Sequence, residues 1–565
     1  MGLLVRRLAL MKTTQIGLAV ITILLILMKV NQLRYEPQIP TGILVSGIRT
    51  PSQPEPVRAA AKENAESGPD WPVAVHSGDI TVEFIHESIT SEPTIAQTKT
   101  LEHTVTTTVS VTPSVVATSH EPLPVPDEYT YRSTQSDFCT DRFTTKYLDL
   151  LRDGKTGYCS TKDASSSSLT CFHTPKSLHT DAHVDSFCIG QDVRFDRYSK
   201  LFHLECARPE KKPAVPLTSL HGYWYGTGPQ YIFNEYMKMQ VRNSTGVKAL
   251  KPVAEDPASR NFTILLKREG SNNIFHSLHE IMSLAYTMDV LRMSRDSKTG
   301  EAFFKSPEDH QSTQVVILDD HPEGPYYDLW QLFSNKKPIR IQELIDQNPE
   351  QPLESLGNVI VPLAGAANPI WHDDWEKHGC VNEIRRTFVR RVLDLYGIKD
   401  DRNQPPSRQL TMTIVDRKET RRLFNLGALV NTTRRAYPDI KVQVIDWAAL
   451  PFKKQIEIAR GTDILVGIHG AGMTQALFMN EGRGAMVEIM PDTGINCFHA
   501  IAMERNLHYF RAHGKVAEVK DDWHNEDVLM DEDKFMLLVD HAVKSLYNRP
   551  GRFRDLYQEE SSSVH

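Results

Sequence analysis

The chain has 565 residues, of which 40% are apolar and 24% are charged, and its formal net charge is −7. This length is enough for one large domain or for two to three ordinary domains with sizeable cores. The negative net charge excludes a protein that binds nucleic acid through an extended basic surface, so no nucleic-acid partner is expected.

The chain opens with an apolar segment that has the features of a membrane anchor. Residues 16–28 carry no charge, basic residues precede them, and no small-residue cleavage site follows. With their flanks they form a run over residues 13–30, which is at the short end for a bilayer span. We expect a single-pass type II signal anchor in the Golgi or endoplasmic reticulum membrane, with residues 1–12 as the cytosolic tail and the body lumenal. The alternative is a cleaved signal peptide.

Residues 31–135 are rich in Ser, Thr, Pro, Glu and Val, and they show no lasting periodicity. Such a segment cannot bury enough apolar surface to offset its loss of conformational entropy. We therefore expect an extended, disordered stem that takes no part in chemistry.

The cysteines and the glycosylation sequons bear on the compartment. No cysteine pair has C-x-x-C spacing, which disfavours a zinc ribbon, and clustered cysteines predict disulfides if the compartment is oxidising. Cys380 and Cys497 stand apart from the cluster, and the odd total leaves at least one thiol unpaired. The clustered cysteines are Cys139, Cys159, Cys171, Cys188 and Cys206, and the N-x-[ST] sequons, which agree with a lumenal body, are at Asn243, Asn261 and Asn431.

Residues 136–405 are predicted to form the amino lobe of an α/β protein. Strands are predicted at residues 262–266, 315–318 and 358–363, and helices at 272–291 and 381–397. His276 and Glu280 are four residues apart and therefore share one face of the first helix, where either can serve as a general base. The alternative is an ordinary solvated pair. Asp319 follows the second strand, at the end where open α/β sheets bind ligands, although Asp is also common there as a turn former.

Residues 406–550 follow a polar, proline-bearing linker and are predicted to form a Rossmann-like carboxyl lobe, with a tail over residues 551–565. Strands are predicted at 410–415, 442–446, 464–468 and 486–490, and helices at 452–460 and 535–547. Arg417 follows the first of these strands, and a guanidinium at that position suits an oxyanion. The alternative is a solvated run of charge.

The most distinctive stretch is residues 463–490, whose pattern predicts a strand, a glycine turn, a helix and a second strand. Backbone N–H groups at such a turn can hold an anion such as a pyrophosphate. The alternative is a tight turn with its histidine packed in the core. The spacing G-x-x-G-x-G differs from the dinucleotide fingerprint, so a nicotinamide cofactor is not indicated. The turn consists of His469, Gly470, Ala471 and Gly472, and the second strand carries Glu488.

Residues 264–511 resemble glycosyltransferase family 61. The resemblance rests on an ordered set of motifs, of which the glycine turn, D-I-x-[VI]-G-x-H-G-A-G-[ML]-T-x-x-L-F with a later Glu, is the most specific. The other motifs lie at residues 273–280, 316–319, 327–329 and 413–417. Together they cover less than half of the chain.

The resemblance implies a GT-B-type fold with two Rossmann-like lobes. It also implies an inverting transfer of a sugar from a UDP-sugar donor to a hydroxyl of a glycoprotein or glycan. N-acetylglucosamine is favoured over xylose as the donor sugar. No cofactor other than the donor is certain, and because Asp319-Asp320-His321 is not a D-x-D motif, a divalent metal stays an open question.

The resemblance also assigns roles to residues. His276 or Glu280 is expected to deprotonate the acceptor, with Asp319 and Asp320 as the next candidates. Arg417 and the N–H groups of residues 469–472 are expected to hold the diphosphate, and Glu488 the ribose hydroxyls.

Two other classes of protein compete with this interpretation. One is a non-catalytic, membrane-anchored glycan-binding or scaffold protein. The other is a hydrolase that uses the glycine turn as an oxyanion loop, which the absence of any G-x-S-x-G motif disfavours.

Overall fold

The computed structural model describes residues 121–547, except for short stretches at 160–166, 179–182, 208, 210, 243–260, 297–298, 307–308, 310, 348, 351, 374–378, 400–408, 492–496, 518–519 and 521–524. The expected cytosolic tail, the anchor at 13–30, most of the stem, the lobe boundary near 405 and the tail at 551–565 lie outside these residues. Within the described part of the chain, no helix combines the length and apolar character that crossing a membrane requires.

The amino lobe contains a mixed sheet that has nine strands among the described residues, in the order β1-β2-β3-β9-β6-β7-β8, with β4 paired to β3 and β5 to β4. The pairs of β6 with β9, β6 with β7 and β7 with β8 are parallel, whereas β1, β2, β3 and β9 pair antiparallel. The strands are β1 (Lys155–Gly157), β2 (Ser168–His173), β3 (Ser186–Asp196), β4 (Leu201–Ala207), β5 (Met237–Arg242), β6 (Phe262–Leu266), β7 (Gln314–Ile317), β8 (Ile339–Arg340) and β9 (Leu353–Val361).

The predicted strands of this lobe are confirmed as β6, β7 and β9. The expected Rossmann-like lobe matches only the parallel part of the sheet, because β1, β2, β3 and β9 pair antiparallel. Short connections such as the one from β3 to β4 permit antiparallel pairing alone, because a parallel pair needs a long crossover. The helices of the lobe are α2 (Asp137–Phe143), α3 (Thr145–Asp153), α4 (Pro229–Tyr236), α5 (Ile274–Arg292), α7 (Ile341–Asp346), α8 (Pro369–Asp373) and α9 (Glu383–Leu395).

Helix α5 is the central helix of the amino lobe. Asn273 caps it by accepting hydrogen bonds from the backbone N–H groups of Phe275 and His276. Nearly every residue from Ile274 to Leu291 is buried, so α5 is enclosed on all sides. Side chains at its start are therefore held in place by packing.

The end of the predicted stem is ordered, which corrects the boundary expected at residue 135. Tyr129 is buried, and its hydroxyl donates a 2.6 Å hydrogen bond to Asp289 of α5. The backbone N–H of Ser133 donates to Glu383 at the start of α9. The segment 121–135 therefore belongs to the amino lobe, since its few anchoring side chains find buried partners on two helices.

Three disulfides lie within the described residues, and they join Cys139 to Cys380, Cys159 to Cys206 and Cys171 to Cys188. Disulfide bonding of the clustered cysteines is confirmed. The expectation that Cys380 stands apart from the clustered cysteines was wrong, because folding brings it to Cys139, 241 positions away in the sequence.

The carboxyl lobe has the parallel sheet expected of a Rossmann-like half. Its strand order is β11-β10-β12-β13-β14, and every pair is parallel. The strands are β10 (Thr411–Val415), β11 (Lys441–Ile445), β12 (Ile464–Ile468), β13 (Ala485–Met490) and β14 (His508–His513), and the helices are α10 (Leu426–Ala436), α11 (Phe452–Arg460), α12 (Cys497–Glu504) and α13 (Glu532–Tyr547). The predicted strands, the helix at 452–460 and the closing helix are confirmed.

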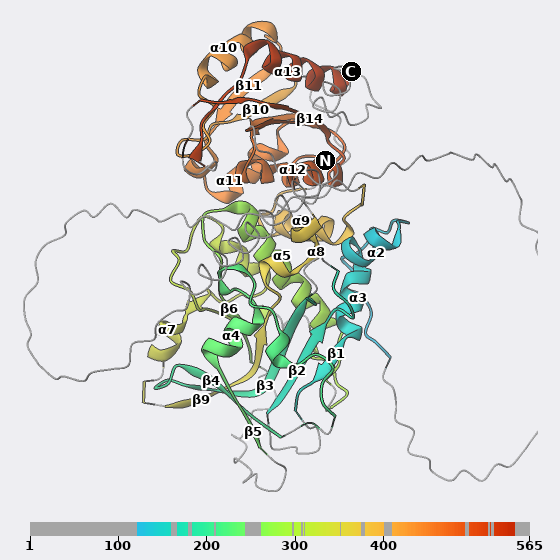
Figure 1. Ribbon diagram of the computed structural model, residues 1–565, viewed down its shortest axis with the longest axis vertical. Coiled ribbons are helices and arrows are strands. Elements are labelled where there is room, and N and C mark those ends of the chain that lie inside the picture. The colour runs from blue at the N-terminus through green and yellow to red at the C-terminus, as the bar shows by residue number, and fades with distance from the viewer. Residues whose placement is uncertain are drawn as a thin grey trace, which may run out of the picture. The chain divides into compact units, whose positions relative to one another are not determined.

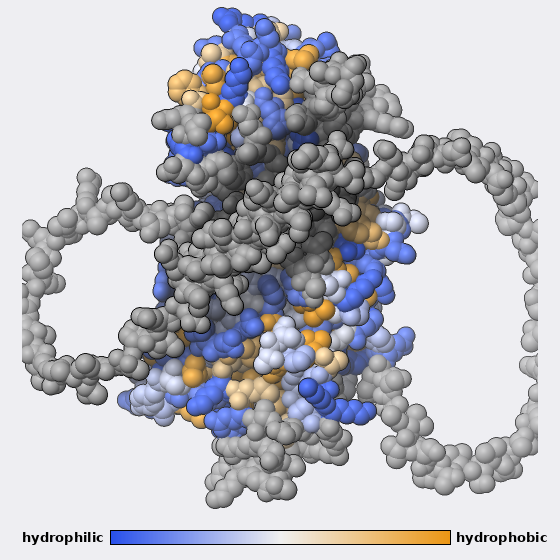
Figure 2. Space-filling view, viewed as in Figure 1, coloured by the Kyte–Doolittle hydropathy of each residue, from blue (hydrophilic) through white to orange (hydrophobic). Residues whose placement is uncertain are grey.

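Helices α10 and α13 cover one face of this sheet, and α11 and α12 cover the other (Figure 1). Every residue of β12 and β13 is buried, which explains why both strands appear in the sequence as continuous apolar runs. On the face seen in Figure 2 the outer surface of this lobe is mostly hydrophilic.

Buried contacts join the two lobes near α12. The Phe275 ring of α5 lies 5.8 Å from that of Phe498, centroid to centroid. Arg385 of α9 forms a 2.7 Å ion pair with Glu504, and both side chains are almost fully buried. Helix α12 thus packs against the start of α5, where the candidate base lies.

Candidate functional site

His276 lies in the first turn of α5 and is partly exposed, and its ring is oriented by a carboxylate. Its Nδ1 is 2.5 Å from Oε1 of Glu269, a residue in the connection between β6 and α5. Its ring also meets that of Trp371 edge to face at 4.9 Å. Because Nδ1 is bound by Glu269, Nε2 is the nitrogen left to exchange a proton with a substrate.

Glu280 is on the same helix but is buried. Its Oε1 accepts a hydrogen bond from the backbone N–H of Glu269, and its Oε2 has no hydrogen-bond partner among the described residues. Burial raises the pKa of Glu280 well above its usual value, and the negative charges of Glu269 and Asp319 add to the rise. This environment favours the neutral carboxyl, so Glu280 suits a base less well than His276 does.

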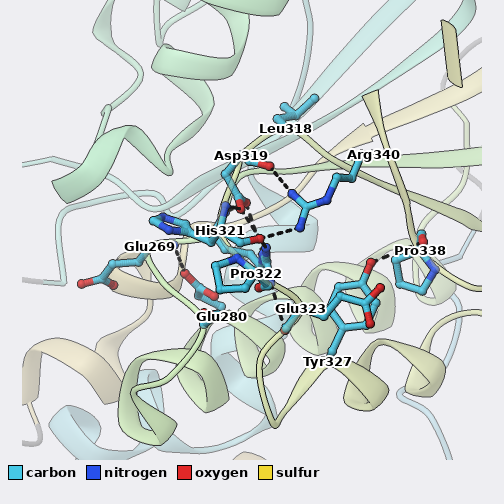
Figure 3. A network of polar contacts seen from close by, with 12 residues as sticks. Glu269, Glu280, Leu318, Asp319, His321, Pro322, Glu323, Tyr327, Pro338 and Arg340 are labelled. Atoms are coloured by element: carbon cyan, nitrogen blue, oxygen red, sulfur yellow. Dashed lines mark hydrogen bonds and ion pairs between the residues drawn. The ribbon is translucent and has the colours of Figure 1, made fainter. Parts of the chain in front are cut away.

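Asp319 is engaged in a buried ion pair. Its oxygens accept hydrogen bonds from the backbone N–H of Arg268 at 2.7 Å and from the Arg268 guanidinium at 2.8 Å. Figure 3 shows the Asp319 carboxylate close to His321. The N–H of His321 donates to Asp319 as well. These contacts fix Asp319 in the loop after β7, and its place among the catalytic candidates stays a prediction.

The glycine turn of the carboxyl lobe lies beneath two guanidinium groups. Gly470 has φ +140°, and a Cβ placed on it would lie 2.6 Å from Nη1 of Arg417 and 3.0 Å from Nη2 of Arg421. Ala471 and Gly472 begin η6 (Ala471–Phe478), a 3₁₀ helix where an α-helix was expected. Arg417 follows β10, as predicted, and the turn follows the neighbouring strand β12.

Arg417 has neutral partners. Its guanidinium donates to the carbonyl and the hydroxyl oxygens of Thr420, and it has no other hydrogen bond among the residues described. Burial lowers the pKa of Arg417 from its usual value. The neighbouring Lys418, by contrast, is exposed and pairs with Asp416. A half-buried guanidinium with neutral partners beside a glycine turn is suited to a bound oxyanion.

Glu488 is fully buried and holds His469. Its Oε1 is 2.7 Å from Nδ1 of His469, and its Oε2 accepts a hydrogen bond from the Tyr509 hydroxyl. Both carboxylate oxygens are therefore used inside the lobe. Glu488 therefore orients His469, and its expected contact with ribose hydroxyls stays a prediction.

The two groups of candidate residues meet the same aromatic ring. The Phe498 ring of α12 lies 5.1 Å from the ring of His469 and also contacts Phe275, the residue before His276. The structure thus brings the glycine turn and the start of α5 into contact with one side chain. Sequence reasoning missed Arg268 and Glu269, although the charged run after β6 was a visible signal. Arg421 was expected, with Arg422, among the basic residues after β10 that could bind phosphates.

Metal binding and glycosylation stay predictions. Among the described residues, no three His, Cys, Asp or Glu side chains gather where they could hold a metal ion. Asn261 and Asn431 are exposed, and Asn243 lies outside the described residues.

A family model described as glycosyltransferase 61 matches residues 274–486, a range that contains His276 and the glycine turn. This range of the chain is similar to glycosyltransferase family 61. The EGF domain-specific O-linked N-acetylglucosamine transferase of Drosophila melanogaster is 24% identical over 251 residues, which are 44% of each chain. The protein of the same name from Pan troglodytes is 29% identical over 187 residues, which are 30% of this chain and 34% of the relative.

A second kind of relative has a different acceptor in its name. The protein O-linked-mannose beta-1,4-N-acetylglucosaminyltransferase 2 of Takifugu rubripes is 23% identical over 252 residues, which are 40% of this chain and 38% of the relative. The matched part spans less than half the length of each of these relatives. All three names describe transfer of N-acetylglucosamine.

Proposed function

We propose that the chain transfers N-acetylglucosamine from a UDP-sugar to a hydroxyl of a glycoprotein or glycan, with inversion at the anomeric carbon and in a GT-B-type arrangement of its lobes. The observation that carries the proposal is the pair of guanidinium groups, Arg417 and Arg421, over the Gly470 turn. The relatives support N-acetylglucosamine over xylose, since each is named for its transfer.

In the proposed reaction, Nε2 of His276 takes the proton of the acceptor hydroxyl. The acceptor oxygen then attacks the anomeric carbon of the donor sugar from the face opposite the diphosphate. The bond from that carbon to the diphosphate oxygen breaks, and its electron pair leaves with UDP.

Each charge that develops in this step has a partner. Glu269 faces Nδ1 of His276 and stabilises the imidazolium that forms. Arg417, Arg421 and the N–H groups at the glycine turn stabilise the departing diphosphate, because fixed donors in a partly dry site need no reorganisation.

We also propose that the protein works in the secretory pathway as a type II protein of the Golgi or endoplasmic reticulum membrane. The three disulfides support an oxidising compartment, and two exposed sequons are compatible with it. We expect the sequons to be occupied. We also expect the body of the protein to be protected when sealed microsomes are treated with protease.

A donor screen tests the proposed activity. Full-length protein is incubated with UDP-N-acetylglucosamine, UDP-xylose and UDP-glucose, and the release of UDP is measured with and without acceptor glycoproteins. Release is expected to be fastest with UDP-N-acetylglucosamine. If no donor is turned over although UDP binds, the result supports a non-catalytic glycan-binding protein.

A further inference from the structure

A cavity of about 640 Å³ opens in the amino lobe next to the Arg268 and Asp319 ion pair. It is lined by the loop after β7, by the 3₁₀ helix η3 (Tyr327–Leu332) and by the connection to β8. Small-molecule sites in proteins have volumes of roughly 300–1,000 Å³, so this cavity is large enough for a ligand. None of the roles assigned above uses it.

The cavity wall is fixed relative to the start of α5. Arg268 donates hydrogen bonds to the backbone carbonyls of Pro322 at 3.0 Å and Glu323 at 3.2 Å. Gly324 has φ +75°, and a Cβ placed there would collide with the backbone oxygen of Ser271, two residues before the Asn273 cap. The loop that lines the cavity is therefore packed against the turn before α5, the helix that carries the proposed base His276.

The lining suits a neutral ligand with many hydroxyl groups. Tyr327 supplies an aromatic ring whose hydroxyl donates to Pro338 and whose ring lies 5.7 Å from the Arg268 guanidinium. Gln331 and Asn335 supply side-chain amides, each of which can donate to one hydroxyl while accepting from another.

The charges of the lining compensate one another. Lys337 pairs with Glu323 at 3.0 Å, and both are exposed at the cavity. Asp328 and Lys336 add one further charge of each sign. A ring, planar amides and balanced charge favour a neutral sugar over an anion or a cation.

We propose that this cavity binds a neutral pyranose of the acceptor's glycan, as a subsite separate from the donor site. The assignment to the acceptor rests on the proposed function, but binding of a sugar in the cavity does not require transfer. Binding and catalysis can therefore fail independently.

The test is ligand-observed saturation-transfer NMR on the full-length protein with two neutral probes, chitobiose and mannobiose. At least one probe is expected to bind, and its signal is expected to persist when UDP is saturating. Tyr327→Ala and the double variant Gln331→Ala with Asn335→Ala should each weaken binding at least tenfold. Gln342→Ala, an exposed amide on α7 outside the cavity, is the matched control and should bind like the parent.

The double variant keeps misfolding from explaining a loss of probe binding. Gln331 and Asn335 are exposed, so replacing their side chains removes no core contact. The proposal would be overturned if neither probe binds or if the probe signal is lost in the presence of UDP. It would also be overturned if the cavity variants bind the probes as tightly as the parent does. If the sugar is carried by the acceptor, Tyr327→Ala will raise the acceptor KM while kcat at saturation stays near the parent value. If the probes bind but Tyr327→Ala leaves the acceptor KM unchanged, the cavity binds a free glycan. That result would overturn the assignment to the acceptor.

Discussion

Nδ1 of His276 and Oε1 of Glu269 are 2.5 Å apart, and this contact leaves Nε2 as the nitrogen available to a substrate. In Glu269→Gln the carboxylate that stabilises the imidazolium is lost while the side-chain shape is kept. We expect kcat to fall about ten- to a hundredfold and the Kd for UDP to stay unchanged, because the contact acts on the chemical step. Glu269→Asp should recover part of the rate if orientation and charge are what matter. Equal loss in both variants, together with weaker UDP binding, would indicate a merely structural role.

The same geometry separates the two candidate bases. Burial favours the neutral form of Glu280, so Glu280→Gln, which is also neutral, should retain transfer within about threefold of the parent, whereas His276→Ala should lose a factor on the order of 10² to 10⁴. Transfer assays at saturating donor decide between them. A large loss in Glu280→Gln with an active His276→Ala would make Glu280 the base.

The glycine turn predicts a steric effect. Gly470→Ala would place a methyl group 2.6 Å from Nη1 of Arg417 in a backbone conformation that L-residues rarely adopt. We expect UDP affinity to fall at least tenfold in titration calorimetry. Gly427→Ala on α10, where a Cβ would meet nothing within 4 Å, is the matched control and should bind UDP normally. Unchanged affinity in Gly470→Ala would exclude the turn from the donor site.

Buried His173 predicts a pH dependence of stability. Burial lowers its pKa from 6.5 to about 4, with its ring nitrogens bound to Tyr158 and Ser186. The unfolded chain therefore binds more protons between these pH values, so the stabilisation is complete above about pH 6.5 and is lost as the pH falls toward 4. Between about pH 7 and pH 5 this one group should cost roughly 2 kcal/mol of unfolding free energy. Denaturant melts at both pH values should show a smaller pH difference in His173→Gln, and an equal difference would contradict the account.

The central strands of the carboxyl lobe were predictable because they are buried on both faces. Strands such as β12 and β13 must be apolar at successive positions, and the glycine turn between them carries a specific motif. The amino lobe was less predictable, since disulfides whose pairing the sequence does not specify join its antiparallel strands. Cys171 of β2 is bonded to Cys188 of β3, and Cys206 of β4 to Cys159. No local pattern specifies that Cys380 reaches Cys139.

The contacts between charged residues at the site could not be predicted from the sequence pattern. Glu269 is seven residues before His276, and only the turn between β6 and α5 brings the two together. Glu488 was visible as a carboxylate at a strand end, but its enclosure by His469 and Tyr509 depends on β14, a strand that was not predicted. The residue types at these positions indicated acid–base groups. Their burial in the folded chain determines which of them can contact a ligand.

The binding of UDP to Arg417→Ala, compared with Lys418→Ala, tests the central claim most directly. Arg417 lies over Gly470, whereas Lys418 is exposed and pairs with Asp416, so the two variants remove neighbouring cations with different surroundings. Loss of a charge-assisted hydrogen bond of roughly 1.5–3 kcal/mol should weaken UDP binding about ten- to a hundredfold in Arg417→Ala. Lys418→Ala should bind UDP like the parent. Parental affinity in Arg417→Ala would contradict the assignment of the donor site to the glycine turn.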